Sequence, residues 1–451
     1  MRSNSSLATL AIALTGTPGL AQEFSQSYKL SPPDESPFAQ FGAAVAVGDG
    51  IVAVGSRFDE TMGTDAGAVF LYEAETGAPL GQLYPDDGFD DAEFGVSVAI
   101  GSGYIAVGAW LDDEMGLATG AVYVFDVLTK EKLYKIFPDD SSLAQFGHSV
   151  AIDNGILAVG APLDGAAILG PGTAFSFQLS TGAMIRKLTT PDVSTGAAFG
   201  RVVDIDNGVV AVGAFADNTA GLFSGSAFLF DALTGNQLYK LVPDDIERGD
   251  RFGSSIAIEN GLLAVGAVED DVNDSSGSVY LFEVATGDQG LNLNPSDGAF
   301  GDFFGASVAV EGDTVIVGSA MDNYFGGDSG SAYLFSASTG AQVGRVLPED
   351  GLSDAFFGSS VAVSNGVAVI GAPNDSQSGL GSGSAYVFGV AMGCSVADLA
   401  PPIGALNFDD ILAFLSAFTD MDPAADLAEP FGALNFDDVL AFLNAFAAGC
   451  P

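Results

Sequence analysis

Acidic side chains are the residues of this sequence whose number and spacing could do chemistry. The chain has 58 Asp and Glu against 13 Lys and Arg, a formal net charge of −45. Carboxylates from several segments can together bind Ca²⁺, which takes about six to eight oxygen ligands, and a pair of carboxylates can hydrolyse a glycosidic bond. One set stands at a fixed offset, four residues after a Gly: Asp59, Asp112, Asp164, Asp217, Asp270, Asp322 and Asp375.

The same seven Asp residues have a simpler interpretation. An Asp side chain in a turn accepts hydrogen bonds from nearby backbone N–H groups, so a fixed offset is typical of turn capping. The densest acidic run, residues 269–274, contains Glu269, Asp270, Asp271 and Asp274 but spells no complete calcium loop. Turn caps and a shared Ca²⁺ site therefore both remain expectations.

Other catalytic chemistry has little support. His148 is the single His, and no Ser or Cys nucleophile pattern accompanies it, which disfavours Ser-His-Asp, Cys-His and zinc chemistry. We therefore expect no enzyme and no catalytic residues, with a carboxylate-based glycan hydrolase or lyase as the alternative. The strong negative charge repels nucleic acid and anionic lipid, so neither is an expected partner.

The elements that position these acids are repeats marked by Phe-Gly. The dipeptide recurs every 52 or 53 residues, at Phe41, Phe94, Phe146, Phe199, Phe252, Phe304 and Phe357. Each repeat holds four short apolar or alternating runs, which predict strands. The first two runs are joined by residue pairs that favour tight hairpins: Asp49-Gly50, Ser102-Gly103, Asn154-Gly155, Asn207-Gly208, Asn260-Gly261, Gly312-Asp313 and Asn365-Gly366.

Seven four-stranded antiparallel units with no helix between them predict an all-β, seven-bladed β-propeller. The last unit, residues 357–390, supplies only three strands, whereas residues 27–32 near the N-terminus read like a fourth strand without its repeat. The N-terminal strand is therefore expected to complete the last blade. Strand polarity then places the loops after the second strands, and those before each Phe-Gly, on one acidic face.

These features resemble FG-GAP repeats, the units of the integrin α-chain propeller and of many secreted bacterial proteins. The resemblance covers residues 27–390 and includes Gly160-Ala161-Pro162 and Gly371-Ala372-Pro373 after second strands. Many family members bind calcium between strands one and two, where this chain has short turns instead. Four aromatic residues at the loops would either stack on a sugar or peptide or pack within the blades: Trp110, Phe215, Tyr324 and Phe325.

The two ends of the chain are expected to lie outside the propeller. Arg2, an apolar run and a small-residue site ending at Ala21 predict a signal peptide over 1–21, hence a secreted or cell-surface protein. No stretch approaches the ~20 apolar residues of a membrane span, so we expect no membrane insertion. The propeller is assigned to 22–392 and a separate module to 393–451.

The C-terminal module contains a duplicated segment between the only two cysteines. In an exported chain Cys394 and Cys450 are expected to form a disulfide. Each copy has an acidic loop and a short amphipathic helix, and together they resemble a GC-type dockerin domain. The resemblance implies Ca²⁺ ligands and a cohesin-like or cell-surface partner, although Ala and Pro replace the middle ligands; the matching positions are Asp398, Asp409, Asp410, Asp426, Asp437 and Asp438. A helical hairpin that merely caps the propeller is the alternative.

The sequence as a whole predicts an exported, non-catalytic binding or adhesion protein. Its propeller would present acidic loops to a protein or glycan ligand, and its tail would attach it to another extracellular component. Ca²⁺ is the only cofactor expected, if any. Besides the glycan-active enzyme, a structural component of a surface layer is a further alternative.

Overall fold

The computed structural model describes residues 25–33, 36–86, 90–138, 143–165, 170–270 and 276–389. The expected signal peptide and the module at 393–451 lie outside the described residues. The same holds for both cysteines and for the six Asp residues assigned to the dockerin-like loops. Asp271 and Asp274 of the densest acidic run also lie outside.

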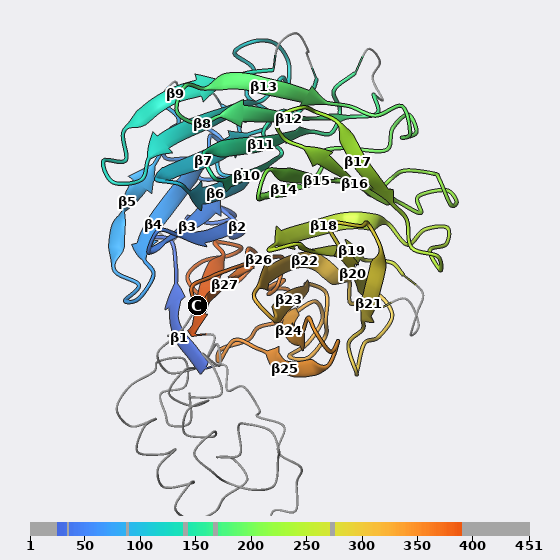
Figure 1. The fold of residues 1–451 in the computed structure, drawn as a ribbon. Helices are drawn as coiled ribbons and strands as arrows, with labels where there is room; N and C mark the ends of the chain where they lie inside the picture. The colour runs from blue at the N-terminus through green and yellow to red at the C-terminus, as the bar shows by residue number, and fades with distance from the viewer. Residues whose placement is uncertain are drawn as a thin grey trace, which may run out of the picture.

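The described residues form seven four-stranded antiparallel sheets arranged as blades around a centre (Figure 1). Blades 1 to 3 contain β2 (Phe41–Gly48), β3 (Ile51–Ser56), β4 (Ala68–Glu73) and β5 (Pro79–Leu83); β6 (Ser97–Gly101), β7 (Tyr104–Ala109), β8 (Ala121–Asp126) and β9 (Lys132–Ile136); β10 (Ser149–Asp153), β11 (Ile156–Ala161), β12 (Thr173–Gln178) and β13 (Ala183–Leu188). Blades 4 to 6 contain β14 (Val203–Asp206), β15 (Val209–Ala214), β16 (Ser226–Asp231) and β17 (Gln237–Leu241); β18 (Phe252–Glu259), β19 (Leu262–Ala267), β20 (Ser278–Glu283) and β21 (Gln289–Leu293); β22 (Phe304–Glu311), β23 (Thr314–Ser319), β24 (Ser331–Ser336) and β25 (Gln342–Val346). Blade 7 contains β26 (Ser360–Ser364), β27 (Val367–Ala372), β28 (Ser384–Gly389) and, from the other end of the chain, β1 (Ser25–Leu30).

The predicted closure of the ring by the N-terminal strand is confirmed. In blade 7 the strand order is β1-β28-β27-β26, and β1 pairs antiparallel with β28 over Ser25 to Leu30. Figure 1 shows this first strand beside the last blade. The strand begins two residues before the predicted stretch and ends at Leu30, and Leu30 is buried in a core shared by blades 7 and 1.

The first strand of each blade lies innermost and contacts the first strands of both neighbours. Its turn into the second strand is a two-residue hairpin, as predicted. Both turn residues have positive φ in six blades, for example Asn207 at 48° and Gly208 at 77°, and in blade 6 Gly312 has it. These turns leave no room for a calcium loop between strands one and two. The strand end beside a turn can also accept a hydrogen bond from the next blade: Asp206 of blade 4 accepts one from the backbone N–H of Asn260 in blade 5 (2.7 Å).

The Phe-Gly dipeptide lies where neighbouring blades pack against each other. The seven Phe rings are fully buried and pack against aromatic residues of the third strand, as Phe94 does on Tyr123 with ring centroids 5.1 Å apart. The following Gly has a positive φ, and a Cβ on Gly42 would stand 2.3 Å from the carbonyl oxygen of Ser384. The Phe therefore belongs to the core, and the Gly allows the close approach of two backbones. No described helix is long and apolar enough to cross a membrane.

Candidate binding face

Two sets of connections share one face of the ring: those from the second to the third strand of each blade, and those from the fourth strand to the next blade. We call this the loop face. The strand polarity that the sequence predicted puts all seven repeated Asp residues there, at the start of the connections after the second strands. Whether these aspartates can contact a ligand depends on how deeply their side chains are buried within that face.

The repeated aspartates lie beneath the loop face. Asp112 is fully buried and the most exposed of the seven, Asp322, is 6% exposed. In at least three of the seven the side chain accepts a hydrogen bond from the backbone N–H two residues on: Asp59 from Thr61 (2.9 Å), Asp112 from Glu114 (3.1 Å) and Asp375 from Gln377 (2.9 Å). The backbone C=O of each accepts a further bond from the Gly that precedes the third strand. In this position the carboxylates fold the loop and do not reach a ligand on the surface.

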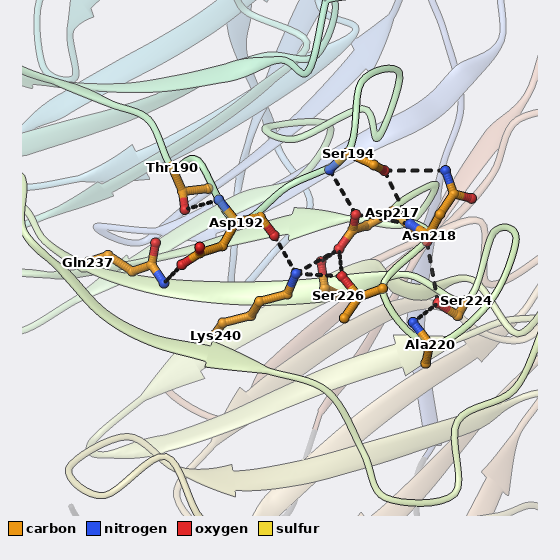
Figure 2. Close-up of polar contacts among 11 residues, drawn as sticks. Thr190, Asp192, Ser194, Asp217, Asn218, Ala220, Ser224, Ser226, Gln237 and Lys240 are labelled. Atoms are coloured by element: carbon orange, nitrogen blue, oxygen red, sulfur yellow. Dashed lines mark hydrogen bonds and ion pairs between the residues drawn. The ribbon is translucent and has the colours of Figure 1, made fainter.

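Asp217 shows the complete arrangement (Figure 2). It accepts hydrogen bonds from the backbone of Ser194 (2.9 Å), from the Ser226 hydroxyl (2.8 Å) and from Lys240 (2.9 Å). Burial alone would raise the pKa of Asp217. These hydrogen bonds, with one more from the Thr219 hydroxyl, outweigh the effect of burial and hold the pKa well below its usual range. The carboxyl is therefore ionised and neutralised within the blade.

Lys240 is one of five basic residues that reach a repeated Asp from the outermost strand of a blade. The pairs have N···O distances of 2.7 to 2.9 Å: Lys29–Asp375, Lys135–Asp112, Lys187–Asp164, Lys240–Asp217 and Arg345–Asp322. Each cation also lies over an aromatic ring of the third strand, as Lys240 does over Phe228 at 5.2 Å. Sequence reasoning missed these cations. Their signal is positional, because each precedes the last apolar residue of its strand.

Blades 1 and 5 lack that basic residue. Gln82 stands at its position in blade 1 and Asn292 in blade 5. In blade 5 the Tyr280 hydroxyl donates to Asp270 (2.6 Å), whereas the buried Oδ2 of Asp59 has no hydrogen-bond partner among the described residues. No three acidic, His or Cys side chains in the described part of the chain gather closely enough to hold a metal ion. The Ca²⁺ expectation remains a prediction.

The surface of the loop face carries apolar rather than repeated acidic side chains. Most of the large hydrophobic residues that are exposed lie on its connections: Phe38, Met62, Met115, Leu117, Leu143, Leu222, Phe223, Phe300, Tyr324, Phe325, Leu352 and Leu380. We call these residues the apolar rim. Large exposed apolar side chains that gather on one face of a molecule can mark a contact surface for a partner. Of the aromatic candidates, Tyr324 (56% exposed) and Phe325 (43%) belong to this rim, whereas Trp110 and Phe215 are half-buried nearer the axis.

A cleft of about 370 Å³ opens where the axis meets the loop face. Its lining comes from blades 6, 7, 1 and 2, at the residues that follow Phe-Gly (Ala43, Val96, Ser359) or follow the second strand (Arg57, Ala320). Contributions from four blades at these ends of the inner strands place the cleft at the channel mouth. We use channel mouth for this cleft and for the matching positions of blades 2 to 5.

Those matching positions hold basic and aromatic residues. His148 and Arg201 follow Phe-Gly in blades 3 and 4, Trp110 and Phe215 follow the second strands of blades 2 and 4, and Arg251 precedes Phe-Gly in blade 5. They link into a chain of contacts from blade to blade. The polar links are Arg57–Glu93 at 3.7 Å, Trp110 Nε1–Glu93 at 2.9 Å and Arg201 Nη1–His148 Nε2 at 3.3 Å; the ring contact is Trp110–His148 at 4.9 Å.

Electrostatics at the mouth follow from this packing. Burial, together with the charge of Arg201, lowers the pKa of His148 to about 3, so the ring is neutral. It donates from Nδ1 to the Arg201 carbonyl (2.9 Å) and accepts from the Arg201 guanidinium at Nε2. Burial and the positive charges of Arg251 and Arg57 lower the pKa of Arg201. Arg201 forms no salt bridge with any described residue, so its positive charge has no carboxylate partner.

One carboxylate elsewhere in the channel departs from the repeat. Asp204 stands in β14 where the other first strands have Ala, and it accepts backbone bonds from Ile258 (2.8 Å) and Ile205 (2.9 Å). Burial, with the nearby charges of Asp206 and Asp153, raises the pKa of Asp204 to about 7. Sequence reasoning missed this residue, although an acid at a position otherwise filled by Ala is visible in the repeat alignment.

Comparison with protein families agrees with the fold. The FG-GAP repeat pattern matches six segments, which together cover more than half of the chain: residues 24–72, 80–125, 184–230, 236–282, 289–335 and 341–388. The unit between the second and third segments, with strands β9 to β12, has the same form in the structure. No curated protein sequence matches the chain. On these matches and this fold, the chain belongs to the FG-GAP repeat family.

Proposed function

We propose that the protein is an exported, non-catalytic binding or adhesion protein whose loop face contacts a protein ligand. The observation that carries the proposal is the apolar rim, because burying it against a partner removes apolar surface from water. The basic channel mouth lies inside this rim, in a molecule of net charge −45. That charge disfavours a second copy of the chain as the partner, since two such molecules repel each other.

The acidic loops of the sequence-based expectation take a different part in this proposal. The repeated aspartates stabilise the loops from below, and the apolar rim supplies the contact surface. The C-terminal module is proposed to attach the propeller to another extracellular component, on its resemblance to dockerin domains. Cleavage near Gln22 and recovery of the chain outside the cell would be the expected signs of export, checked by N-terminal mass spectrometry.

Adhesion of the full-length protein tests the contact surface. Beads coated with the wild-type chain are expected to bind the surface of the producing cells or their extracellular material. The double variant F223D/Y324D, in the apolar rim, should reduce this binding at least about tenfold, because two charges would be desolvated at the contact. The control variant L128D/L233D changes exposed leucines in turns on the opposite face (85% and 55% exposed) and should bind like wild type. Equal loss in both variants would overturn the assignment to the loop face.

A carboxylate-based glycan hydrolase or lyase is the second candidate, and Asp204 is the observation that favours it. A carboxyl with a raised pKa beside other acids is a typical general acid. Asp204 nevertheless does not line the cleft at the channel mouth, and its oxygens are bonded to backbone N–H groups. Incubation with a panel of polysaccharides should release no new reducing or unsaturated ends. Release that is abolished in D204N would favour the enzyme instead.

A further inference from the structure

The channel mouth combines a positive charge, which has no carboxylate partner among the described residues, with an apolar wall. On the side of blades 1 to 5 it carries Arg57, Arg201 and Arg251, while the acids beside them are Glu93 and Glu269. Three arginines against these two glutamates make the local balance positive within a molecule of net charge −45, and the neutral His148 adds nothing to it. On the side of blades 6, 7 and 1 the cleft is lined mainly by apolar residues, with Gln40, Ser359 and Asn374 among them; the apolar ones are Ala43, Ala320, Met321, Phe356 and Pro373.

The basic residues are held in place by the chain of contacts that links the blades. Arg57 donates to Gln40 (2.8 Å) and lies over the Phe58 ring, while Arg201 lies over Phe215 at 5.3 Å and bonds His148. A guanidinium has five N–H donors, so these contacts leave several donors of Arg201 for a ligand. Arg201 is exposed, so these donors are open to solvent.

The residue before each Phe-Gly also contributes side chains to the channel mouth. It has a positive φ between 51° and 58° in every blade, at Gln40, Glu93, Gln145, Ala198, Arg251, Phe303 and Phe356. Gly would be the least strained residue in that conformation, yet a side chain is present each time. Gln40 and Phe356 line the cleft. The side chains at this strained position differ between blades, whereas the buried parts of the repeat are nearly uniform.

We propose that the channel mouth binds a carboxylate attached to an apolar group, with Arg201 and Arg57 contacting the carboxylate and the wall at Met321 and Phe356 contacting the apolar part. This deepens the proposed function, on which it rests: the carboxylate is an acidic side chain or C-terminus of the protein ligand that covers the apolar rim. The apolar wall disfavours a phosphate or sulfate group, since such ions are strongly hydrated and would lose water without new hydrogen bonds there.

Titration of the full-length protein with 3-phenylpropionate tests the site directly. Calorimetry and NMR should show saturable binding with a Kd of about 1 mM, in line with the affinity of small ligands of this size. The neutral isostere 3-phenylpropionamide should bind at least about tenfold more weakly, because it lacks the charge that pairs with the guanidinium. Inorganic phosphate should not compete at equal concentration.

Three variants test whether 3-phenylpropionate binds through the proposed residues. R201Q and R57Q should each weaken 3-phenylpropionate binding about tenfold, and M321E should do so from the apolar side. The control R186Q changes an exposed arginine of β13 that bonds only to the backbone of Thr234 and Ile185 in the described structure, and it should bind like wild type. Equal binding of acid and amide, tighter binding of phosphate, or an unchanged R201Q that melts like wild type would each overturn the proposal.

The two proposals fail in different ways. If F223D/Y324D abolishes adhesion while 3-phenylpropionate does not bind, the loop face stands as the contact surface and the carboxylate site is wrong. If the probe binds through Arg201 while the rim variants adhere like wild type, the site stands and the ligand is not one that covers the rim.

Discussion

At the scale of single residues, most of the few basic side chains of this acidic protein neutralise buried carboxylates or stand at the channel mouth. Five of them neutralise a buried aspartate inside a blade, and three arginines border the channel mouth. A buried carboxylate without its cation costs several kcal/mol, because desolvation is no longer offset. Most of the other acids in the described structure are exposed or half-buried, where water and salt screen them, although Asp59 and Asp270 are buried in blades that lack this basic residue.

Removing a buried cation should destabilise its blade. K240M leaves Asp217, which is 1% exposed at its side chain, without its ion pair. We expect the free energy of unfolding to fall by about 3 kcal/mol, measured by urea denaturation at pH 7. K132M, at a lysine whose partner Asp86 is 58% exposed, is the control and should change stability by less than about 0.5 kcal/mol. Similar losses in the two variants would contradict the role of burial.

Supplying the missing cation in blade 1 should have the opposite effect. Q82K places a lysine at the position that Lys135 or Lys240 holds in other blades, where it could reach the Oδ2 of Asp59, which has no hydrogen-bond partner among the described residues. The new hydrogen bond should raise the free energy of unfolding by about 1 kcal/mol. Q82M, which has similar length and no charge, separates this effect from packing. A gain in Q82M that equals the gain in Q82K would count against the ion pair.

Asp204 should make stability depend on pH. Its folded-state pKa of about 7 lies above the unfolded value of ~3.9, so its contribution to stability is full below about pH 4 and is lost as pH rises to 7. D204N keeps a hydrogen-bond acceptor but does not ionise. It should therefore be more stable than wild type at pH 8, on the order of 2 kcal/mol, and the difference should shrink by pH 4.5. Parallel pH profiles would show that Asp204 does not titrate in this range.

At the scale of elements, the N-terminal strand does more than complete a sheet. β1 pairs with β28, buries Leu30 between blades 7 and 1, and supplies Lys29 to Asp375 as the fourth strands of other blades supply theirs. Residues more than 340 positions apart are thereby held together. Ring closure therefore rests on interactions of the same kind as those within each blade.

A single substitution should test this closure. L30D puts a charge at a buried position of an outermost strand and should cost about 3 kcal/mol, with faster hydrogen exchange at the amides of β28. L80D, at a 37% exposed leucine of the outermost strand of blade 1, is the matched control and should cost less than about 0.5 kcal/mol. Unchanged exchange in β28 of L30D would mean that β1 does not hold the ring closed.

At the scale of the whole molecule, the charge of −45 should make stability depend on salt. The acids repel one another in the folded ring, and added ions screen this repulsion, whereas the buried ion pairs are screened little. The melting temperature should rise between 10 mM and 0.5 M NaCl. CaCl₂ at matched ionic strength tests the calcium expectation for the full chain: an additional rise with a saturating dose would support a site, and equal curves would contradict it.

Much of the architecture could be predicted because the repeat is local information. Phe-Gly spacing, alternating runs and turn pairs such as Asn207-Gly208 indicated strands, blade number and hairpins, and the incomplete last repeat indicated which strand closes the ring. The surroundings of Asp217 could not be predicted in the same way. Its partners Ser194 and Lys240 lie 23 residues away on either side, on other loops and strands, and only the folded blade brings them together.

What the sequence by itself determined is thus the period, the fold and the face on which the repeated aspartates lie, because side-chain alternation and turn chemistry act between near neighbours. Only the tertiary structure decided that those aspartates are buried, that five of them are neutralised by a cation, and that Arg57, Trp110, His148 and Arg201 meet around the channel mouth. The physical reason is closure of the ring: residues one repeat apart become neighbours in space, and burial and charge depend on neighbours in space rather than on order along the chain.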